Sequence, residues 1–286
     1  MASVATIDGA NPGDFYDQHV LGSRPAVVRD ATRWPAFGKW SLDFFRTQFA
    51  DHKITAGNRD FRMADFIDTI ERSTPENPAP YLREWPINRE LPALLPDITP
   101  PPAVTLPNWI NGNLLPKRWK IYGGVPELLI GGNGAGFPYL HFDAYHQHAF
   151  ITQVVGGKDF VMFDPKDTPY LYPLGGDSLK TQLTDVRKVD LEKYPLFAKA
   201  TPITFRLQPG ETVFVPAGWW HVTYIDEPTI AVSLNTANGS NWKAMARDMS
   251  LESEGVKRLI KRTYLEMLGV VLPLLPRGAA RWLNIG

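Results

Sequence analysis

Short apolar and alternating runs dominate the second half of the chain. From about residue 119 to residue 235, stretches rich in β-branched and aromatic residues are bounded by Gly, Pro or Asp, a pattern typical of short strands. The predicted strands are 128–130, 148–155, 160–163, 203–207, 212–215 and 229–234. This succession indicates an antiparallel sandwich or barrel.

The N-terminal part of the chain predicts mixed α and β structure. Residues 24–28 form a short strand pattern, and Ser41 is placed to cap a helix with Phe45 and Phe49 on one face. A second helix is predicted over residues 63–70. We therefore expect a small α/β segment ahead of the β-rich core.

A proline-rich stretch separates these two parts. Eleven of the 26 prolines lie between Pro75 and Pro116, which argues against a regular helix or a central strand there. The stretch also carries apolar residues such as Tyr81 and Trp85. These side chains favour an extended wrap along the core, and a flexible linker between domains is the alternative.

Helical periodicity returns after Asn241, and Pro273 ends it. An apolar stripe is formed by Val256, Leu259, Ile260, Met267, Leu268 and Val271, with Leu274 and Leu275 beyond the proline. The basic residues 257, 258, 261 and 262 are expected on other faces. The stripe is more apolar than docking on a barrel requires. A dimer contact, packing on the core and binding to a membrane surface remain open.

These patterns predict three parts and a fold that is mainly β with flanking helices. Residues 1–118 form the α/β segment and the wrap, residues 119–241 the β-rich core, and residues 242–286 the C-terminal helical segment. With 286 residues, 44% of them apolar, the chain can bury a core but is too short for more than two average domains.

Charge and cysteine content narrow the possible functions. Thirty Lys and Arg balance 30 Asp and Glu, so no overall field attracts nucleic acid or an anionic membrane. The absence of cysteine excludes disulfides, thiolate metal sites and a cysteine nucleophile. The N-terminus lacks a signal-peptide pattern and no apolar run reaches membrane-span length, so we expect a cytoplasmic protein.

Three histidines crowd into residues 141–148. Side chains at positions i and i+2 of a strand share a face, so His141 and Asp143 can offer a nitrogen and an oxygen to one metal ion. A His-x-Asp pair alone is a weak signal, and its plain alternative is a solvated histidine beside a turn aspartate.

A second segment strengthens the metal hypothesis. Residues 209–221 combine a tight turn, a short apolar strand, a Pro-x-Gly bend and two tryptophans, and they end at His221. Small barrels place ligand sites at such strand mouths. We therefore predict that His141, Asp143 and His221 bind one metal ion.

These motifs resemble those of the jumonji-C (JmjC) oxygenases of the cupin superfamily, which bind Fe(II) and 2-oxoglutarate. The resemblance spans about residues 119–236 and is carried by residues 139–143, 153–158, 163–165, 172–173 and 210–221. It implies a double-stranded β-helix (jelly-roll) core. It also implies Fe(II) on His141, Asp143 and His221, with three adjacent positions left for 2-oxoglutarate and O2.

The resemblance also implies a site for the cosubstrate. Lys158 matches the lysine that receives the distal carboxylate of 2-oxoglutarate in this family. Ser233 lies where relatives carry a hydroxyl that contacts the cosubstrate. Asn235, two residues later, shares its face and competes for that role.

The chain departs from the family pattern at two positions. Pro138 replaces a common Thr or Ser, and Ile151 stands where some relatives have Asn. A missing polar contact could come from Tyr122 or Tyr139. The cosubstrate pocket is therefore expected to be more apolar than the family pattern.

His146 and His148 form a second i, i+2 pair. They could bind another metal ion, but no carboxylate joins them in sequence. We favour contact with the substrate or a structural role.

The leading functional hypothesis is hydroxylation of a side chain in a protein or peptide. Hydroxylation of a small amino-acid-like metabolite and a non-catalytic JmjC-like binding protein are the alternatives. A cupin that uses its metal without a cosubstrate conflicts with Lys158. A nucleic-acid partner is not expected, because the basic cluster 257–262 lacks a stacking surface. JmjC hydroxylases of this kind often dimerise through C-terminal helices, which implies a homodimer.

Overall fold

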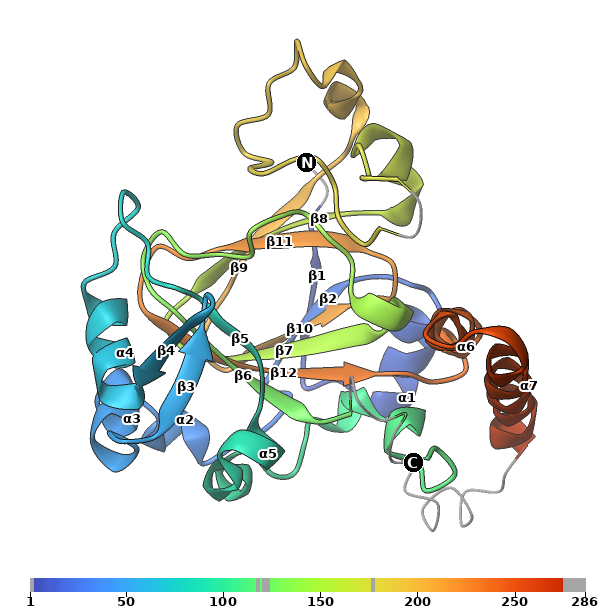
Figure 1. Cartoon of the computed structure of the whole chain (residues 1–286), viewed down its shortest axis with the longest axis horizontal. Helices are drawn as coiled ribbons and strands as arrows, with labels where there is room; N and C mark the ends of the chain where they lie inside the picture. Colours follow the sequence, from blue (N-terminus) through green and yellow to red (C-terminus); the bar gives the residue numbers. More distant parts are fainter. Residues whose placement is uncertain (1–2, 117–118, 120–123, 176–177, 275–286) are drawn as a thin grey trace.

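Two facing sheets form the centre of the molecule (Figure 1). The structure is a computed structural model that describes residues 3–116, 119, 124–175 and 178–274. The large sheet has the strand order β1-β2-β10-β7-β12-β6-β5, and the small sheet has the order β11-β8-β9. This arrangement, with helices on its flanks, confirms the predicted jelly-roll core.

The strands match the sequence pattern closely in the core. All six strands predicted there are present, and β11 joins them although it was not predicted. In order the strands are β1 (Ala5–Asp8), β2 (Ala26–Arg29), β3 (Lys53–Ala56), β4 (Arg59–Arg62), β5 (Leu82–Pro86), β6 (Pro126–Gly131), β7 (His148–Val155), β8 (Lys158–Phe163), β9 (Ile203–Leu207), β10 (Glu211–Val215), β11 (Trp220–Tyr224) and β12 (Thr229–Thr236).

Seven α-helices are described, five of them before the core. They are α1 (Pro12–Phe15), α2 (Ala36–Lys39), α3 (Leu42–Gln48), α4 (Met63–Glu71), α5 (Ile87–Glu90), α6 (Trp242–Leu251) and α7 (Gly255–Val271). Short 3₁₀ helices include η2 (Pro92–Ile98), η6 (Ala144–His146) and η7 (Pro165–Tyr170).

The central strand β7 is buried on both faces, including its polar residues Thr152 and Gln153. Val154 packs toward the N-terminal helices, whereas Ile151 belongs to the cluster between the two sheets. The turn after β7 needs Gly156, because its φ is +63° and a Cβ there would lie 2.2 Å from the carbonyl oxygen of Pro228.

Helices α3 and α4 cover the outer face of the large sheet. The Ser41 side chain accepts a hydrogen bond from the Phe44 N–H at 3.0 Å, so Ser41 caps α3 as predicted. Phe45 and Phe66 are fully buried in the cluster that also contains Leu128 of β6. The N-terminal segment thus supports the sheet from behind.

The proline-rich stretch packs on this sheet rather than linking domains. Trp85 and Leu94 are buried in the same cluster as α4. The stretch contains β5 as well as short helical turns, and β5 lies at the edge of the sheet, where Pro86 is tolerated. Strands β1, β2 and β5 all precede residue 119 and belong to the large sheet. The three-part division of the chain stays a prediction.

Residues between η7 and β9 cross the outer face of the small sheet. Leu171 and Leu183 pack there against Trp220. This segment also pairs with the backbone beside His141, which lies in isolated bridges rather than in a strand, because the Thr181 N–H donates to the Leu140 carbonyl at 3.1 Å.

Helices α6 and α7 pack beside one end of the barrel (Figure 1). On α7, Leu265, Leu268 and Lys261 are buried, so Lys261 does not lie on an outer face as expected from the sequence. The rest of the predicted stripe is exposed, at Val256, Leu259, Ile260, Met267, Val271 and Leu274. Leu275 lies outside the described residues. No helix in the described part of the chain combines the length and apolar character needed to cross a bilayer.

Candidate metal centre

Two histidines lie side by side because their backbones pair. The His141 N–H donates to the His221 carbonyl at 3.1 Å, and the His221 N–H donates to the His141 carbonyl at 2.6 Å. Their ring centroids are 4.3 Å apart. Asp143 completes a group whose ligand atoms all lie within 4.8 Å of one another. The fold therefore brings together the three residues that the motifs singled out.

Backbone carbonyls orient both imidazoles. Nδ1 of His141 lies 3.3 Å from the Tyr139 carbonyl oxygen, and Nδ1 of His221 lies 3.1 Å from that of Trp219. Because a carbonyl only accepts, each Nδ1 carries the proton and each Nε2 keeps its lone pair. Burial, and next the charge of His221, hold the pKa of His141 well below its usual range. This ring stays neutral, as a metal ligand must.

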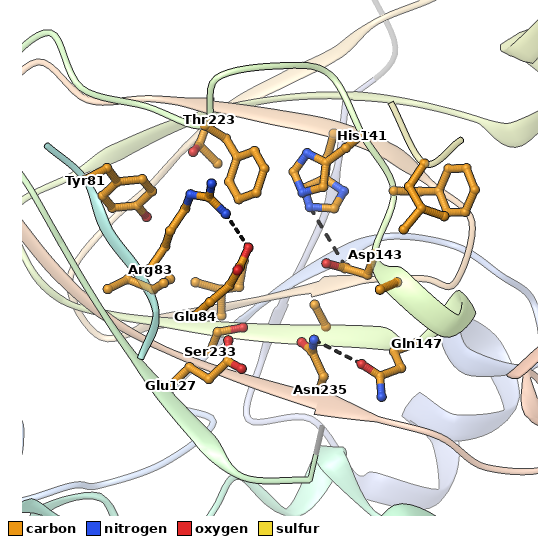
Figure 2. Close-up of a pocket in the computed structure, with 18 of the residues that line it drawn as sticks. Tyr81, Arg83, Glu84, Glu127, His141, Asp143, Gln147, Thr223, Ser233 and Asn235 are labelled. Atoms are coloured by element: carbon orange, nitrogen blue, oxygen red, sulfur yellow. Dashed lines mark hydrogen bonds and ion pairs between the residues drawn. The ribbon is translucent and has the colours of Figure 1, made fainter. Parts of the chain in front are cut away.

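The Asp143 carboxylate fits a metal ion. Its Oδ2 is buried, has no hydrogen-bond partner among the described residues, and lies 3.9 Å from Nε2 of His221 (Figure 2). Burial raises the pKa of Asp143. A buried oxygen without a donor is costly, and a divalent cation held by this carboxylate together with the two imidazoles would compensate its charge. Two imidazoles and one carboxylate suit non-haem Fe(II).

The three residues face a cavity of about 550 Å³. At the end of the cavity opposite His141 and Asp143 lies Tyr81 (Figure 2). The Lys158 ammonium donates to the Tyr81 hydroxyl at 2.8 Å, and Lys158 is only 1% exposed. Burial lowers the pKa of Lys158 to about 7. A buried cation with a neutral partner is suited to receive an anion.

Comparison with known proteins agrees with this geometry. The profile of the Cupin-like domain family matches residues 12–236. A chicken (Gallus gallus) protein named tRNA wybutosine-synthesizing protein 5 is 38% identical over 261 residues, which covers 81% of this chain and 76% of the relative. The chain belongs to the JmjC oxygenases of the cupin-like family.

Other relatives of the oxygenase carry names that fit this family. Mouse (Mus musculus) 2-oxoglutarate and iron-dependent oxygenase JMJD4 is 27% identical over 90% of this chain and 66% of its own length. Arabidopsis thaliana Arginine-specific demethylase JMJ20 is 24% identical over 86% of this chain and 60% of its own length. The chain thus spans less than two thirds of these two relatives. Iron and 2-oxoglutarate are the cofactors of this oxygenase class.

Most of the predicted cosubstrate residues of the oxygenase line the cavity. Lys158, Ser233, Asn235 and Tyr139 all do so. Ser233 is 7% exposed, and the Asn235 amide donates to Oε1 of Gln147 at 3.2 Å (Figure 2). Tyr122 lies outside the described residues, so its predicted role stays a prediction.

Several lining residues were missed in the sequence motifs. Glu127 of β6 lies beside Ser233, and Thr223 of β11 faces it across the cavity (Figure 2). Burial first, and then the charges of Glu84 and Asp143, raise the pKa of Glu127 to about 7. A glutamate in an otherwise apolar strand run was the signal that could have revealed it. The motifs contain no acidic cluster, but the fold supplies carboxylates from outside them.

His146 and His148 have protein partners. The His148 Nδ1 accepts from the Ala217 N–H at 2.9 Å, and its Nε2 donates to the Ser240 hydroxyl at 2.8 Å. The His146 Nδ1 donates to Oδ2 of Asp248 at 2.5 Å. Both ring nitrogens of His148 are engaged, which favours the structural role over a second metal site.

Proposed function

We propose that this oxygenase hydroxylates a side chain of a protein or peptide. The observation that carries the proposal is the size and opening of the cavity. About 550 Å³ exceeds what a small dicarboxylate fills, and the lining residues Glu84 and Lys180 are exposed, so the cavity opens to solvent. An extended polypeptide could present one side chain through this mouth.

Iron and the cosubstrate would be held by separate residues. His141, Asp143 and His221 would bind Fe(II), and Lys158 with Tyr81 would bind the distal carboxylate of 2-oxoglutarate. Bound iron would couple loss of CO2 from 2-oxoglutarate to transfer of one O2 atom to a substrate C–H bond and the other to succinate. The apolar side chains of Ile151 and Leu129 line the same cavity.

The remaining polar groups suit a substrate that donates hydrogen bonds. Glu127 has a raised pKa and makes no hydrogen bond to a described residue that fixes its carboxyl group, whereas Arg83 is paired with Glu84. Tyr139 offers an aromatic face near His141 at the cavity. Glu127 and Tyr139 are therefore our candidates for contact with the substrate.

Two other substrate classes remain candidates. A small amino-acid-like metabolite could enter the same cavity. An RNA base is favoured by one observation, the 38% identity with the chicken protein named for tRNA wybutosine synthesis. Against RNA, the chain has a net charge of zero, and the cavity arginine Arg83 is already paired with Glu84.

A fractionation experiment separates these classes. The iron-loaded protein is incubated with 2-oxoglutarate and with the protein, small-molecule or RNA fraction of one lysate. We expect a gain of one oxygen atom on a polypeptide, measured by mass spectrometry, together with succinate formation. The Asp143→Ala variant is the control. Turnover with only the RNA or the small-molecule fraction would replace the protein proposal.

We also propose that the protein is a homodimer and that it is cytoplasmic. Helix α7 has two apolar faces, one packed against α6 and one exposed at Ile260 and Met267. An exposed apolar helix face of this length is typical of a contact surface. A second copy can cover it through an antiparallel pairing of α7 with itself.

The dimer can be tested without disturbing the packed face of α7. Replacing both Ile260 and Met267 with Glu places charges only on the exposed stripe, so we expect a dimer-to-monomer change with the fold retained. Light scattering measures the mass, and Arg258→Glu on the same helix is the control. A wild-type protein that is already monomeric at micromolar concentration would reject the dimer.

A further inference from the structure

Asp143 differs from the two histidines in how its side chain is held. Both imidazoles are fixed through Nδ1 to backbone carbonyls, but Oδ2 of Asp143 has no hydrogen-bond partner among the described residues. The direction of the carboxylate therefore depends on the backbone that follows it. Asp143 is the residue that precedes the single turn η6.

The backbone of η6 adopts an uncommon conformation. Tyr145 has φ 56° and ψ 23°, and His146 has φ 48°. Two consecutive non-glycine residues in the left-handed region are sparsely populated and persist only when their surroundings fix them. Contacts from outside the turn must therefore maintain this path of the chain.

These contacts come from the C-terminal helices. The Tyr145 hydroxyl donates to Oε1 of Glu252, and the His146 Nδ1 donates to Oδ2 of Asp248 at 2.5 Å. The Asn241 amide donates to the His146 carbonyl oxygen at 2.8 Å. Three contacts thus run along α6, from Asn241 at its start to Glu252 at its end, and bind the consecutive residues Tyr145 and His146 of η6.

Cations fix the two acidic partners in turn. Arg247 pairs with Oδ1 of Asp248 at 2.8 Å. Lys261, buried on α7, donates to Oε2 of Glu252 at 2.6 Å. Each carboxylate therefore uses one oxygen for η6 and the other for a cation, which fixes its orientation. The ion pair with Glu252 explains why the charged Lys261 side chain is buried on α7.

We propose that Asp248 and Glu252 are positioning residues of the metal site: the C-terminal helices hold η6 in its left-handed path and so aim the Asp143 carboxylate at the metal. The proposal rests on the proposed role of Asp143 as an iron ligand. It gives the C-terminal segment a part in the site although neither Asp248 nor Glu252 lines the cavity.

The test measures Fe(II) binding without turnover. Asp248→Ala, Glu252→Ala and the double variant are titrated anaerobically with Fe(II) alone, and thermal unfolding is followed on the same metal-free samples. We expect about tenfold weaker Fe(II) binding in each single variant and a larger loss in the double variant. Hydrogen exchange of the amides of residues 144–148 should accelerate in the metal-free double variant.

Two controls make the result specific. Glu266→Ala breaks an exposed pair with Arg262 on α7 and should leave Fe(II) affinity unchanged. Asp248→Asn keeps an oxygen that accepts from His146 and should restore most of the affinity. If the double variant does not fold, the single variants decide by the same criteria.

The outcomes separate this proposal from the proposed function. Wild-type protein that does not bind Fe(II) would refute the metal site itself. Wild-type binding with unchanged affinity and unchanged exchange at residues 144–148 in the folded variants would refute the positioning role. A lower unfolding temperature without weaker Fe(II) binding would likewise show that these contacts only stabilise the fold.

Discussion

Replacing Asp143 with alanine is expected to abolish the visible charge-transfer band that Fe(II) and 2-oxoglutarate give together under anaerobic conditions. The loss of Fe(II) affinity in this variant should exceed the roughly 10–100-fold drop that substitutions outside the metal ligands cause. The metal-free variant should be at least as stable as the wild type. This opposite effect follows because burial raises the pKa of Asp143, so the charged carboxylate costs free energy in the folded state.

The control for this experiment is Asp226→Ala. Asp226 is largely exposed and pairs with Arg206, away from the cavity lining. The Asp226→Ala variant should keep the charge-transfer band and the wild-type affinity for iron. A band of normal intensity in Asp143→Ala would remove Asp143 from the metal site.

The second large effect concerns Lys158. In Lys158→Met, we expect 2-oxoglutarate to bind about 100-fold more weakly or worse, because its distal carboxylate would lose its buried countercharge. Iron binding should change little, since the Lys158 ammonium pairs with Tyr81 rather than with a metal ligand. The charge-transfer band, titrated with 2-oxoglutarate, gives the affinity. Lys166→Met, at an exposed lysine, is the control.

The Lys158→Met variant should also be more stable than the wild type, and the difference in stability should depend on pH. Burial lowers the pKa of Lys158 from 10.5 to about 7, so the unfolded chain binds more protons than the folded chain between these values. The gain from Lys158→Met is therefore largest at or below pH 7, on the order of a few kcal/mol, and shrinks as pH rises toward 10.5. Denaturant unfolding at several pH values measures it.

The affinity for 2-oxoglutarate should depend on pH through the same titration of Lys158. In the free protein Lys158 loses its charge as pH rises through about 7, so the apparent affinity for 2-oxoglutarate should fall above that value, by up to about tenfold per pH unit. Lys158→Met should lack this dependence. A wild-type affinity that stays constant from pH 6.5 to 8.5 would show that another cation receives the carboxylate.

The sequence predicted the parts of the fold that local patterns determine. Short β-branched and aromatic runs bounded by Gly, Pro or Asp marked the core strands, and the Ser41 cap marked the start of α3. Strand β11 was missed although its aromatic and β-branched residues, Trp220, Val222, Thr223 and Tyr224, fit the same strand pattern. The helical stripe of α7 was recognised, but periodicity alone could not tell that Leu268 faces inward while Ile260 faces solvent.

The site was predictable where its residues lie in ordered motifs. His141, Asp143 and His221 came from such motifs, and the backbone pairing of His141 with His221 of β11 brings them together. Tyr81 and Glu127 were not found, because they reach the cavity only through the pairing of β5 with β6 and of β6 with β12. Long-range pairing leaves no local signal for Tyr81, whereas Glu127 stood out only as a charged residue in an otherwise apolar run.

The segment between η7 and β9 connects the mouth of the cavity to the backbone around His141. Leu179 and Lys180 line the cavity, and the neighbouring Thr181 donates to the carbonyl of Leu140, next to His141. This loop therefore cannot be replaced independently of the metal site in order to change substrate selectivity. A new loop must preserve the register of residues 179–181, and substitutions at exposed side chains such as Lys180 are the safer route to altered selectivity.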